Sequence, residues 1–371
     1  MRHIAKRMLL LTVIVVLAGC SGSNTSFNTP GSSSNPGNGN PSNAQILIAG
    51  FYSEGSKNLP CYWKITAGVA NLTPLQHDDY NTEAYSVYFS NNTVYTAGDY
   101  MDDDGNSFPC YWRDYVKINL GAGEGHAQSI FVSGDRVYIA GFYNNGTKNI
   151  PCYWSNLADA EDAVTLQRVD LQSGPGDAAS QSIYISGGVV YNAGFYNDGT
   201  NDIPCYWAGN VKSDLGTGQG HAQAIYGSGG AVYIAGYYNN GSKDIPCFWN
   251  QFPLNPMKKD LPLPSGSMNA YTWSLHIAGN SFYIAGYYNK DSRNIPCYWM
   301  FTSGIASRTD LPGGNYNAVA QSICHANNTV YNAGFYVVGD GNIPCYWIGG
   351  TKFDLDVPNN GSAEAQSIFV Y

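Results

Sequence analysis

The sequence predicts an all-β protein with the fold of a seven-bladed β-propeller. Three observations support this: a tripeptide that recurs seven times, four strand-like runs in each repeat, and complementary partial repeats at the two ends. The composition agrees, because only 12% of the 371 residues are charged while Gly (43) and Tyr (30) are frequent. Short runs rich in Val, Ile and Tyr between turn residues are typical of β-strands.

The repeat is marked by the tripeptide Cys-Tyr-Trp, with Phe in place of Tyr in one copy. Each copy follows a proline, and an Ala-Gly pair lies upstream of it. The cysteines of the motif are Cys61, Cys110, Cys152, Cys205, Cys247, Cys297 and Cys345. Their successive spacings of 49, 42, 53, 42, 50 and 48 residues are those of a propeller blade.

One repeat contains four strand signals. Residues 128–132 alternate in polarity, residues 137–143 and 150–154 form two further runs, and a weaker fourth run resembles residues 212–215. Asn145-Gly146 between the second and third runs is a tight hairpin signal, because both central residues of a type I′ turn need positive φ. Four short antiparallel strands per repeat make a propeller blade, and no helical period favours a helical solenoid.

The two ends of the chain predict how the ring closes. Residues 46–50 read as the second strand of a repeat, and residues 365–369 read as the first. One blade should therefore take its inner strand from the C-terminus and its other three strands from the N-terminus. Such pairing removes the exposed sheet edges that would otherwise recruit other chains. We expect a single propeller over residues 45–371.

Residues 1–20 read as an export leader. Arg2, Lys6 and Arg7 are followed by an apolar stretch over 8–18 that is too short to span a bilayer. The stretch ends in Leu17-Ala18-Gly19-Cys20, which resembles the bacterial lipobox. That resemblance implies cleavage before Cys20 and a diacylglycerol anchor on its sulfur. An ordinary secretory signal with a chance cysteine is the alternative.

Residues 21–44 follow as a segment made almost entirely of Ser, Asn, Gly, Pro and Thr. This composition cannot bury much apolar area and predicts a flexible tether. Ser21 follows the cysteine, and by analogy with lipoprotein sorting in enteric bacteria this favours the outer membrane. We therefore expect a bacterial cell-envelope protein that contacts the membrane only through its lipid.

The repeat resembles kelch-like propeller repeats and, most of all, the HAF-type extracellular repeat of bacteria. That family combines a glycine-containing strand, a short aromatic motif ending in Trp, and Asp-Leu-Gly. Cys205-Tyr206-Trp207, Asp214-Leu215-Gly216 and Ala235-Gly236 follow this order, although Pro-Cys-Tyr-Trp replaces the His-Ala-Phe-x-Trp of the family. The resemblance implies an exported propeller and no known reaction.

Residues that are constant among the blades are expected to serve packing. The seven motif cysteines occupy equivalent places in different blades, too far apart for disulfides, so we expect buried apolar residues on the third strands. Cys324 lies on an inner strand, where its pairing stays open. The motif Trp and Tyr should pack between blades. A recurrent aspartate before leucine should accept backbone N–H bonds in a turn: Asp170, Asp214, Asp260, Asp310 and Asp354.

Positions that vary among the blades are the better candidates for a site. The residue entering each inner strand, and the residue two positions later, should lie near one mouth of the central channel. The candidate ligand-binding residues are Glu83, Tyr85, His126, His221, Tyr271, Trp273 and Glu364. Flat apolar faces beside donors and acceptors suit a sugar or a peptide. Solvated strand ends with no ligand are the alternative.

Several other functions find little support. A net charge of −9 argues against a nucleic-acid partner. No nucleophile or phosphate-loop motif is present, and no cofactor is expected. Asp102 and Asp104 alternate as in a Ca²⁺ loop, but the terminal glutamate is missing, so we expect no metal site. His126 and His221 lie in separate repeats without a third ligand.

These features favour a monomeric, non-enzymatic binding module that is held at the envelope by its lipid. Its partner would be an envelope protein or an extracellular glycan bound at the propeller mouth. A polysaccharide lyase or hydrolase is the second hypothesis, because Glu83 and Glu364 fall in blades that flank the closure and could act as paired carboxyl groups. A purely structural envelope protein is the third hypothesis.

Overall fold

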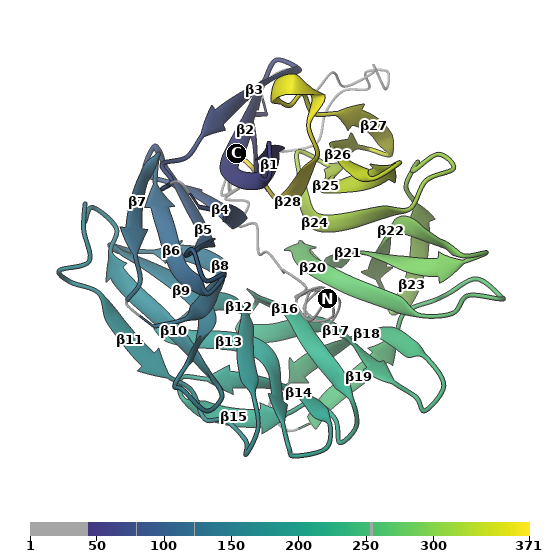
Figure 1. Cartoon of the computed structure of the whole chain (residues 1–371). Coiled ribbons are helices and arrows are strands. Elements are labelled where there is room, and N and C mark those ends of the chain that lie inside the picture. Colours follow the sequence, from purple (N-terminus) through teal and green to yellow (C-terminus); the bar gives the residue numbers. More distant parts are fainter. Residues whose placement is uncertain (1–43, 79, 122, 253–254) are drawn as a thin grey trace, which may run out of the picture.

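The structure, a computed structural model, describes residues 44–371 except 79, 122 and 253–254. These residues form seven four-stranded antiparallel sheets arranged as the blades of a ring (Figure 1). The predicted seven-bladed β-propeller is confirmed. The predicted leader at 1–20, with Cys20, lies outside the described residues, as does the predicted tether up to residue 43.

The blades are numbered along the chain, and each is given from its inner to its outer strand. Blade 1 consists of β28 (Ala363–Val370), β1 (Ile46–Glu54), β2 (Lys57–Thr66) and β3 (Val69–Pro74). Blade 2 consists of β4 (Thr82–Ser90), β5 (Thr93–Met101), β6 (Ser107–Arg113) and β7 (Val116–Asn119). Blade 3 consists of β8 (Gly125–Ser133), β9 (Arg136–Asn144), β10 (Asn149–Leu157) and β11 (Gln167–Asp170).

The remaining blades repeat this order. Blade 4 consists of β12 (Ala178–Ser186), β13 (Val189–Asn197), β14 (Asp202–Ala208) and β15 (Val211–Asp214), and blade 5 of β16 (Gly220–Ser228), β17 (Ala231–Asn239), β18 (Asp244–Phe252) and β19 (Asn255–Asp260). Blade 6 consists of β20 (Ala270–Ala278), β21 (Ser281–Lys290), β22 (Arg293–Thr302) and β23 (Ile305–Asp310). Blade 7 consists of β24 (Ala318–Ala326), β25 (Thr329–Val338), β26 (Gly341–Ile348) and β27 (Thr351–Asp354), and a 3₁₀ turn at Pro358–Asn360 leads from it to β28.

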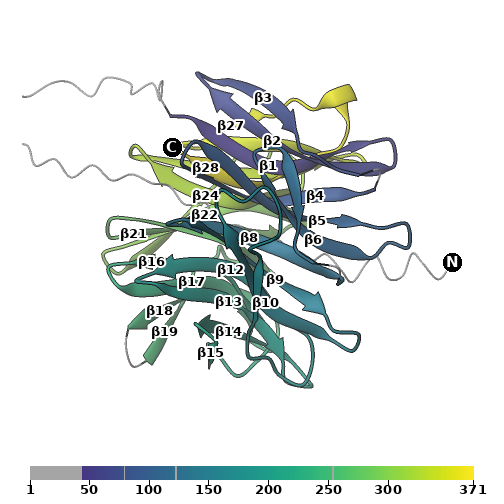
Figure 2. The same cartoon turned by 90° about the vertical axis from the view of Figure 1, so that its left-hand side faces the viewer.

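Blade 1 closes the ring as the sequence predicts. The inner strand β28 comes from the C-terminal end and pairs antiparallel with β1, so the first and last described segments lie side by side (Figure 1). Beyond the strand ends, the backbones of Gln45 and Tyr371 exchange two hydrogen bonds of 3.0 Å. Figure 2 shows the closed ring edge-on.

The repeated motif packs each blade against the next. All seven motif cysteines are fully buried with unbonded thiols, and the seven tryptophans of the motif are at most 1% exposed. In five blades the indole Nε1 donates to a backbone carbonyl at the end of the preceding blade, as Trp112 does to Gln76 at 2.6 Å. The predictions of buried cysteines and of tryptophans between blades are confirmed.

A second set of inter-blade bonds joins the inner strands. The Ser86 hydroxyl accepts a hydrogen bond from the Ile130 backbone N–H of the next blade at 3.0 Å. Equivalent serines make this bond at four further blade contacts, including Ser322 to Ile368 across the closure. The recurrent serine therefore fixes the position of each inner strand along its neighbour in the next blade.

Each inner strand carries one β-bulge, and the repeated glycine faces it. The register of β8 against β9 shifts between Ala127 and Ser129, so Gln128 is the extra residue. A Cβ on Gly141 would lie 1.9 Å from the carbonyl oxygen of His126. The equivalent glycines of all seven blades show the same close approach, at 1.9–2.1 Å. Only glycine fits there.

The recurrent aspartates have a different role from the one the sequence suggested. They end outer strands, where each accepts a hydrogen bond from a tyrosine hydroxyl of the second strand, as in Tyr143–Asp170 at 2.9 Å. A Lys or Arg side chain of the outer strand lies over the same tyrosine ring, with Arg168 at 3.6 Å from the Tyr143 centroid. The expected turn role is wrong for these five residues, which instead hold the outer strand to the blade.

Candidate functional site

One end of the propeller, here called the mouth, is formed by the hairpins between the second and third strands and by the start of each inner strand. The residue that enters the inner strand at this end is called the rim residue. Going around the ring, the rim residues are Glu364, Glu83, His126, Ala179, His221, Tyr271 and Val319. The bulge follows two positions later, so it sets the direction of the rim side chain.

Four rim side chains bind the residue three positions before the motif cysteine in the preceding blade. Asparagine donates where the rim residue is a glutamate, and aspartate accepts where it is histidine or tyrosine. We call these contacts latch pairs: Asn58–Glu83 (2.6 Å), Asn342–Glu364 (2.6 Å), Asp202–His221 (3.2 Å) and Asp244–Tyr271 (2.6 Å). The predicted residues Glu83, Glu364, His221 and Tyr271 therefore join adjacent blades.

Two carboxyl groups of blade 2, those of Glu83 and Asp99, act on His126 of blade 3. The Tyr85 hydroxyl donates to Glu83 at 2.9 Å, and His126 Nδ1 lies 2.9 Å from the carboxylate of Asp99, which is only 2% exposed. Burial raises the pKa of Glu83, and Asp99 adds to the rise. Burial alone would lower the pKa of His126, but the two carboxylates outweigh it and raise that pKa.

Glu364 is the most perturbed carboxyl group of the mouth. Burial and the neighbouring charge of Glu83 raise its pKa from the usual 4.5 to about 7, although hydrogen bonds from Asn342 and Gln366 oppose the rise. The Gln366 amide donates to Glu364 at 2.7 Å, in the same relation that Tyr85 has to Glu83. The two glutamates therefore share one electrostatic environment across the blade 1–blade 2 contact.

We expect the folding stability to fall as the pH rises from about 5 to 8, in part because of Glu364. A carboxyl group whose pKa is raised in the folded state binds its proton more tightly there than in the unfolded chain, so ionisation between about 4.5 and 7 favours unfolding. The full contribution is about 3 kcal/mol. Glu364→Gln should reduce this slope in denaturant titrations at pH 5 and pH 8.

The control for that prediction is Glu54→Gln, which changes an exposed glutamate at the end of the neighbouring strand β1. It should keep the slope of the unchanged protein. Equal slopes for Glu364→Gln and the unchanged protein would contradict the assignment.

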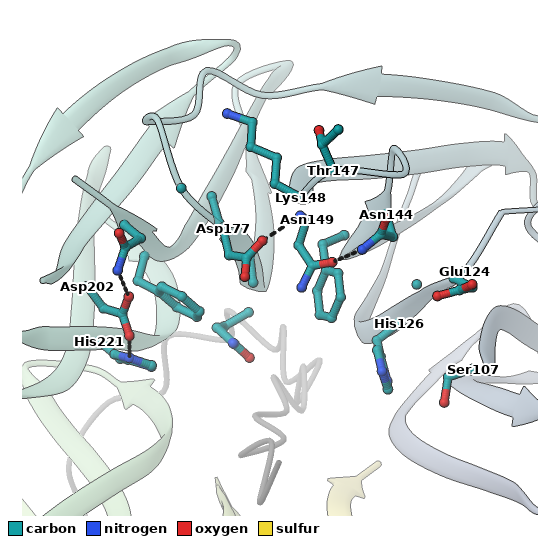
Figure 3. Close-up of a pocket in the computed structure, with 18 of the residues that line it drawn as sticks. Ser107, Glu124, His126, Asn144, Thr147, Lys148, Asn149, Asp177, Asp202 and His221 are labelled. Carbon is teal, nitrogen blue, oxygen red and sulfur yellow. Dashed lines mark hydrogen bonds and ion pairs between the residues drawn. The ribbon is translucent and has the colours of Figure 1, made fainter. Parts of the chain in front are cut away.

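A cavity of about 1080 Å³ opens at the mouth across blades 2 to 5. Figure 3 shows His126 and His221 on opposite sides of it, with Lys148, Asn149 and Asp177 between them. Of the seven predicted residues, His126 and His221 line this cavity. Glu83, Tyr85, Tyr271, Trp273 and Glu364 lie around the rest of the mouth, where Tyr271 and Trp273 stack with ring centroids 5.9 Å apart.

Ala179 cannot form a latch pair between blades 3 and 4, where the cavity lies. In the next blade contact, the His221 ring stacks on Phe195 at 4.0 Å and bonds Asp202. The equivalent rim residue of blade 4 is Ala179, whose side chain has no polar group for a latch pair with Asn149. Ala179 and Phe142 are buried, at 3% and 8% exposure, and both line the cavity together with Asn149.

The walls are rich in hydrogen-bond acceptors. Asn149 accepts from Asn144 at 3.0 Å, and its backbone N–H donates to Asp177 at 2.7 Å. Gln181 of the blade 4 bulge also lines the cavity; it is 3% exposed, and its Oε1 has no hydrogen-bond partner among the described residues. The same lack of a partner holds for the bulge glutamines Gln128, Gln223, Gln321 and Gln366, so this buried acceptor belongs to the repeat and does not mark the cavity.

The lysine and histidine side chains that line the cavity are already paired. Lys148 Nζ donates to the Gly174 carbonyl at 2.5 Å, and His126 lies against Asp99. His221 bonds Asp202, and this contact is the main cause that lowers the pKa of Asp202 to about 2. Glu124 and Asp177 add negative charge to the lining.

The Asp102–Asn106 loop borders the cavity through its last residues. Asp102 accepts backbone hydrogen bonds from Asp104 (3.0 Å) and Asn106 (2.9 Å), and its other oxygen accepts from the Asn106 amide at 3.0 Å. The loop's own donors thus engage the Asp102 carboxylate. Within the described residues, no group of three His, Cys, Asp or Glu side chains is placed to hold a metal ion.

Sequence reasoning missed several residues that build this site, namely Asp99, Phe142, Asn149, Asp177, Ala179 and Gln181. A signal for some of them exists in the repeats themselves. The residue three positions before the motif cysteine changes together with the next rim residue, as in Asn58 with Glu83 and Asp202 with His221. Ala179 and Val319 then stand apart, because neither side chain can pair with the asparagine of the preceding blade, Asn149 or Asn294.

Comparison with known proteins adds no family. No protein-family model matches the sequence, and no curated protein matches it significantly. Over residues 44–371, apart from the few undescribed positions, no helix is long and apolar enough to cross a membrane. The fold and the geometry of the mouth therefore carry the functional argument.

Proposed function

We propose that the chain is a lipid-anchored binding module of the bacterial cell envelope, with its ligand site in the cavity across blades 2 to 5. The observation that carries this proposal is the cavity of about 1080 Å³, whose lining combines aromatic rings such as Phe195 and Tyr237 with acidic side chains such as Glu124 and Asp177. A rigid ring with one concave, partly apolar site and a few convergent polar groups is typical of a binding protein. The ligand is an envelope protein or an extracellular glycan.

The ligand site is tested by in-cell cross-linking and purification from detergent-solubilised native envelopes. The unchanged protein should enrich a partner, and Glu124→Arg should lose it, because Glu124 lines the cavity and is exposed. Asp340→Arg is the matched control, since Asp340 is an exposed acidic residue near the β25–β26 turn, outside the cavity lining. A partner retained by both variants, or none above background, would contradict the site.

The anchor is tested by metabolic labelling with radioactive palmitate. The proposal expects label in the unchanged protein, and it expects Cys20→Ala to lose both the label and membrane association. Ser21→Ala serves as the control, because it leaves the acceptor cysteine in place. Unlabelled protein in the soluble fraction would reject the anchor but leave the cavity proposal untouched.

A second candidate is a polysaccharide hydrolase or lyase, and the pKa of Glu364 favours it. A carboxylic acid with a pKa of about 7 could act as a general acid at neutral pH. The latch bond from Asn342 and the hydrogen bond from Gln366 engage both oxygens of Glu364, so we propose the binding role first. If the protein turns over envelope polysaccharides and Glu364→Gln loses this activity, the enzyme becomes the favoured function and the binding module the second.

A further inference from the structure

We propose that the cavity binds a peptide segment through a lysine or arginine side chain, at the contact between blades 2 and 3. This inference rests on the proposed function, because it names the ligand class of the same site. It follows from a hydrogen bond that the other six blade contacts make at the mouth and this contact lacks, and from the charge of the cavity walls.

Six of the seven blade contacts share a backbone bond at the mouth, here called the linker bond. Its donor is the backbone N–H of the residue three positions before the motif cysteine, and its acceptor is the side-chain oxygen two positions before the next rim residue. The donor and acceptor residues are Asn58–Asn81, Asn149–Asp177, Asp202–Gln219, Asp244–Asn269, Asn294–Asn317 and Asn342–Ser362, at 2.7–3.0 Å. Amide, carboxylate and hydroxyl oxygens all serve, so the bond is a regular part of how one blade holds the next.

The contact between blades 2 and 3 lacks the linker bond. Ser107 holds the donor position and Glu124 the acceptor position, but no hydrogen bond joins these two described residues, and both line the cavity. The hairpin loop before Ser107, residues 102–106, is one residue longer than the loop at 145–148 in blade 3. His126 forms no latch pair here, because its ring lies against Asp99. Figure 3 shows Ser107 and Glu124 beside His126 on one wall of the cavity.

The carboxylates of Glu124 and Asp177 give the cavity negative charge that the protein does not neutralise. Glu124 is exposed, and in the described part of the chain its carboxylate has neither a hydrogen bond nor an ion pair. The Asp177 carboxylate accepts the linker bond from Asn149 and forms no ion pair with a described residue. The lysine and histidine side chains of the lining are engaged by other groups. A ligand that brings a cation is therefore favoured.

A basic peptide matches both features of this contact. An ammonium or guanidinium group donates several hydrogen bonds and binds a carboxylate strongly, so a lysine or arginine side chain fits Glu124. A backbone carbonyl of the same peptide can accept from the Ser107 N–H in place of the missing linker bond. The volume of about 1080 Å³ is at the upper end of the range for small-molecule sites, roughly 300–1,000 Å³, and leaves room for the peptide backbone. A neutral sugar could bond the same groups but would leave the charge uncompensated.

The test removes the two charges with residue types that the repeat already uses. The double variant Glu124→Asn with Asp177→Asn places at both positions the asparagine that three other blades have there. The new amide oxygens can accept the linker bond, as those three asparagines do. The matched control, Glu54→Gln with Asp340→Asn, removes two exposed carboxylates near the hairpins of blades 1 and 7, outside the cavity lining.

Binding is measured by titration calorimetry with trilysine that is acetylated and amidated at its ends. Triglutamine and triglutamate blocked in the same way, and the disaccharide of N-acetylglucosamine, are measured alongside. We expect trilysine to bind the unchanged protein and the control, and to bind the double variant about tenfold more weakly or not at all. Its affinity should also fall as NaCl is raised from about 50 to 300 mM, because salt screens the attraction. Unchanged thermal unfolding of both double variants would show that the loss is local.

Three results would overturn the inference: trilysine that binds no better than triglutamine, preferential binding of triglutamate or the disaccharide, or equal trilysine affinity in the double variant and the control. The outcome for the proposed function is separate. If a partner is still captured from envelopes in a manner that depends on Glu124 while trilysine fails, the binding module stands and the basic peptide does not.

Discussion

Removing residues 363–371 is expected to prevent the propeller from folding into a closed ring. The deletion takes away β28, the inner strand of blade 1, and exposes the paired edge of β1. Ile368, Phe369 and Val370 are buried to 1% exposure or less. Their burial alone is worth roughly 5–9 kcal/mol, which is comparable to the whole stability of a typical domain.

The truncated chain should be insoluble or should aggregate, since an open sheet edge pairs readily with other chains. Size-exclusion chromatography and circular dichroism measure this directly. The control is a circular permutant that starts at residue 357 and joins Tyr371 to Gln45, whose backbones already bond each other. It retains β28 in place and should fold. A soluble, monomeric truncated chain with an unchanged spectrum would show that β28 does not close the ring.

Gly141→Ala is expected to destabilise the protein by more than about 4 kcal/mol. The new Cβ would lie 1.9 Å from the His126 carbonyl oxygen and 2.9 Å from the ring of Trp154. The first neighbour belongs to the bulged strand and the second is a fully buried indole, so neither can move without disturbing the blade. Thermal and denaturant unfolding should show the loss, or the variant should fail to express in soluble form.

Gly218→Ala is the matched control for this substitution. It lies in the linker between blades 4 and 5, its backbone φ is not positive, and a Cβ there would meet no atom within 4 Å. Its melting temperature should stay within about 2 °C of the unchanged protein. If the melting temperature of Gly141→Ala also stays within about 2 °C of the unchanged protein, the bulge accommodates a Cβ and the prediction is wrong.

The fold was accessible from the sequence because the repeats reveal it. Seven copies of the Cys-Tyr-Trp motif, one with Phe in place of Tyr, give the number of blades. The partial repeats at residues 46–50 and 365–369 give the closure, which β28 and β1 confirm. Repetition also separates packing residues from the rest, as the buried cysteines demonstrate. The aspartate role was missed because Asp170 bonds a side chain of the second strand, 27 residues away, and not its own turn.

The site was accessible only in part. The rim positions could be located, but their contacts depend on the bulge at Gln128 and its equivalents, which turns the rim side chain toward the preceding blade. Residue type alone could not distinguish His221, which is engaged by Asp202, from a residue that is free to bind. The cavity is also lined by residues outside the rim positions, such as Glu124, Asn149 and Asp177, and sequence reasoning about the inner strands passed over them.

The pairing of Gln45 with Tyr371 has a consequence for how the molecule would sit at a surface. Both residues lie beyond the ends of β1 and β28 that are farthest from the rim residue Glu364. Any segment that precedes residue 44 therefore joins the ring on the side opposite the mouth. If that segment carries the proposed lipid, the cavity points outward from the membrane, so tethering and ligand capture use separate faces and do not compete.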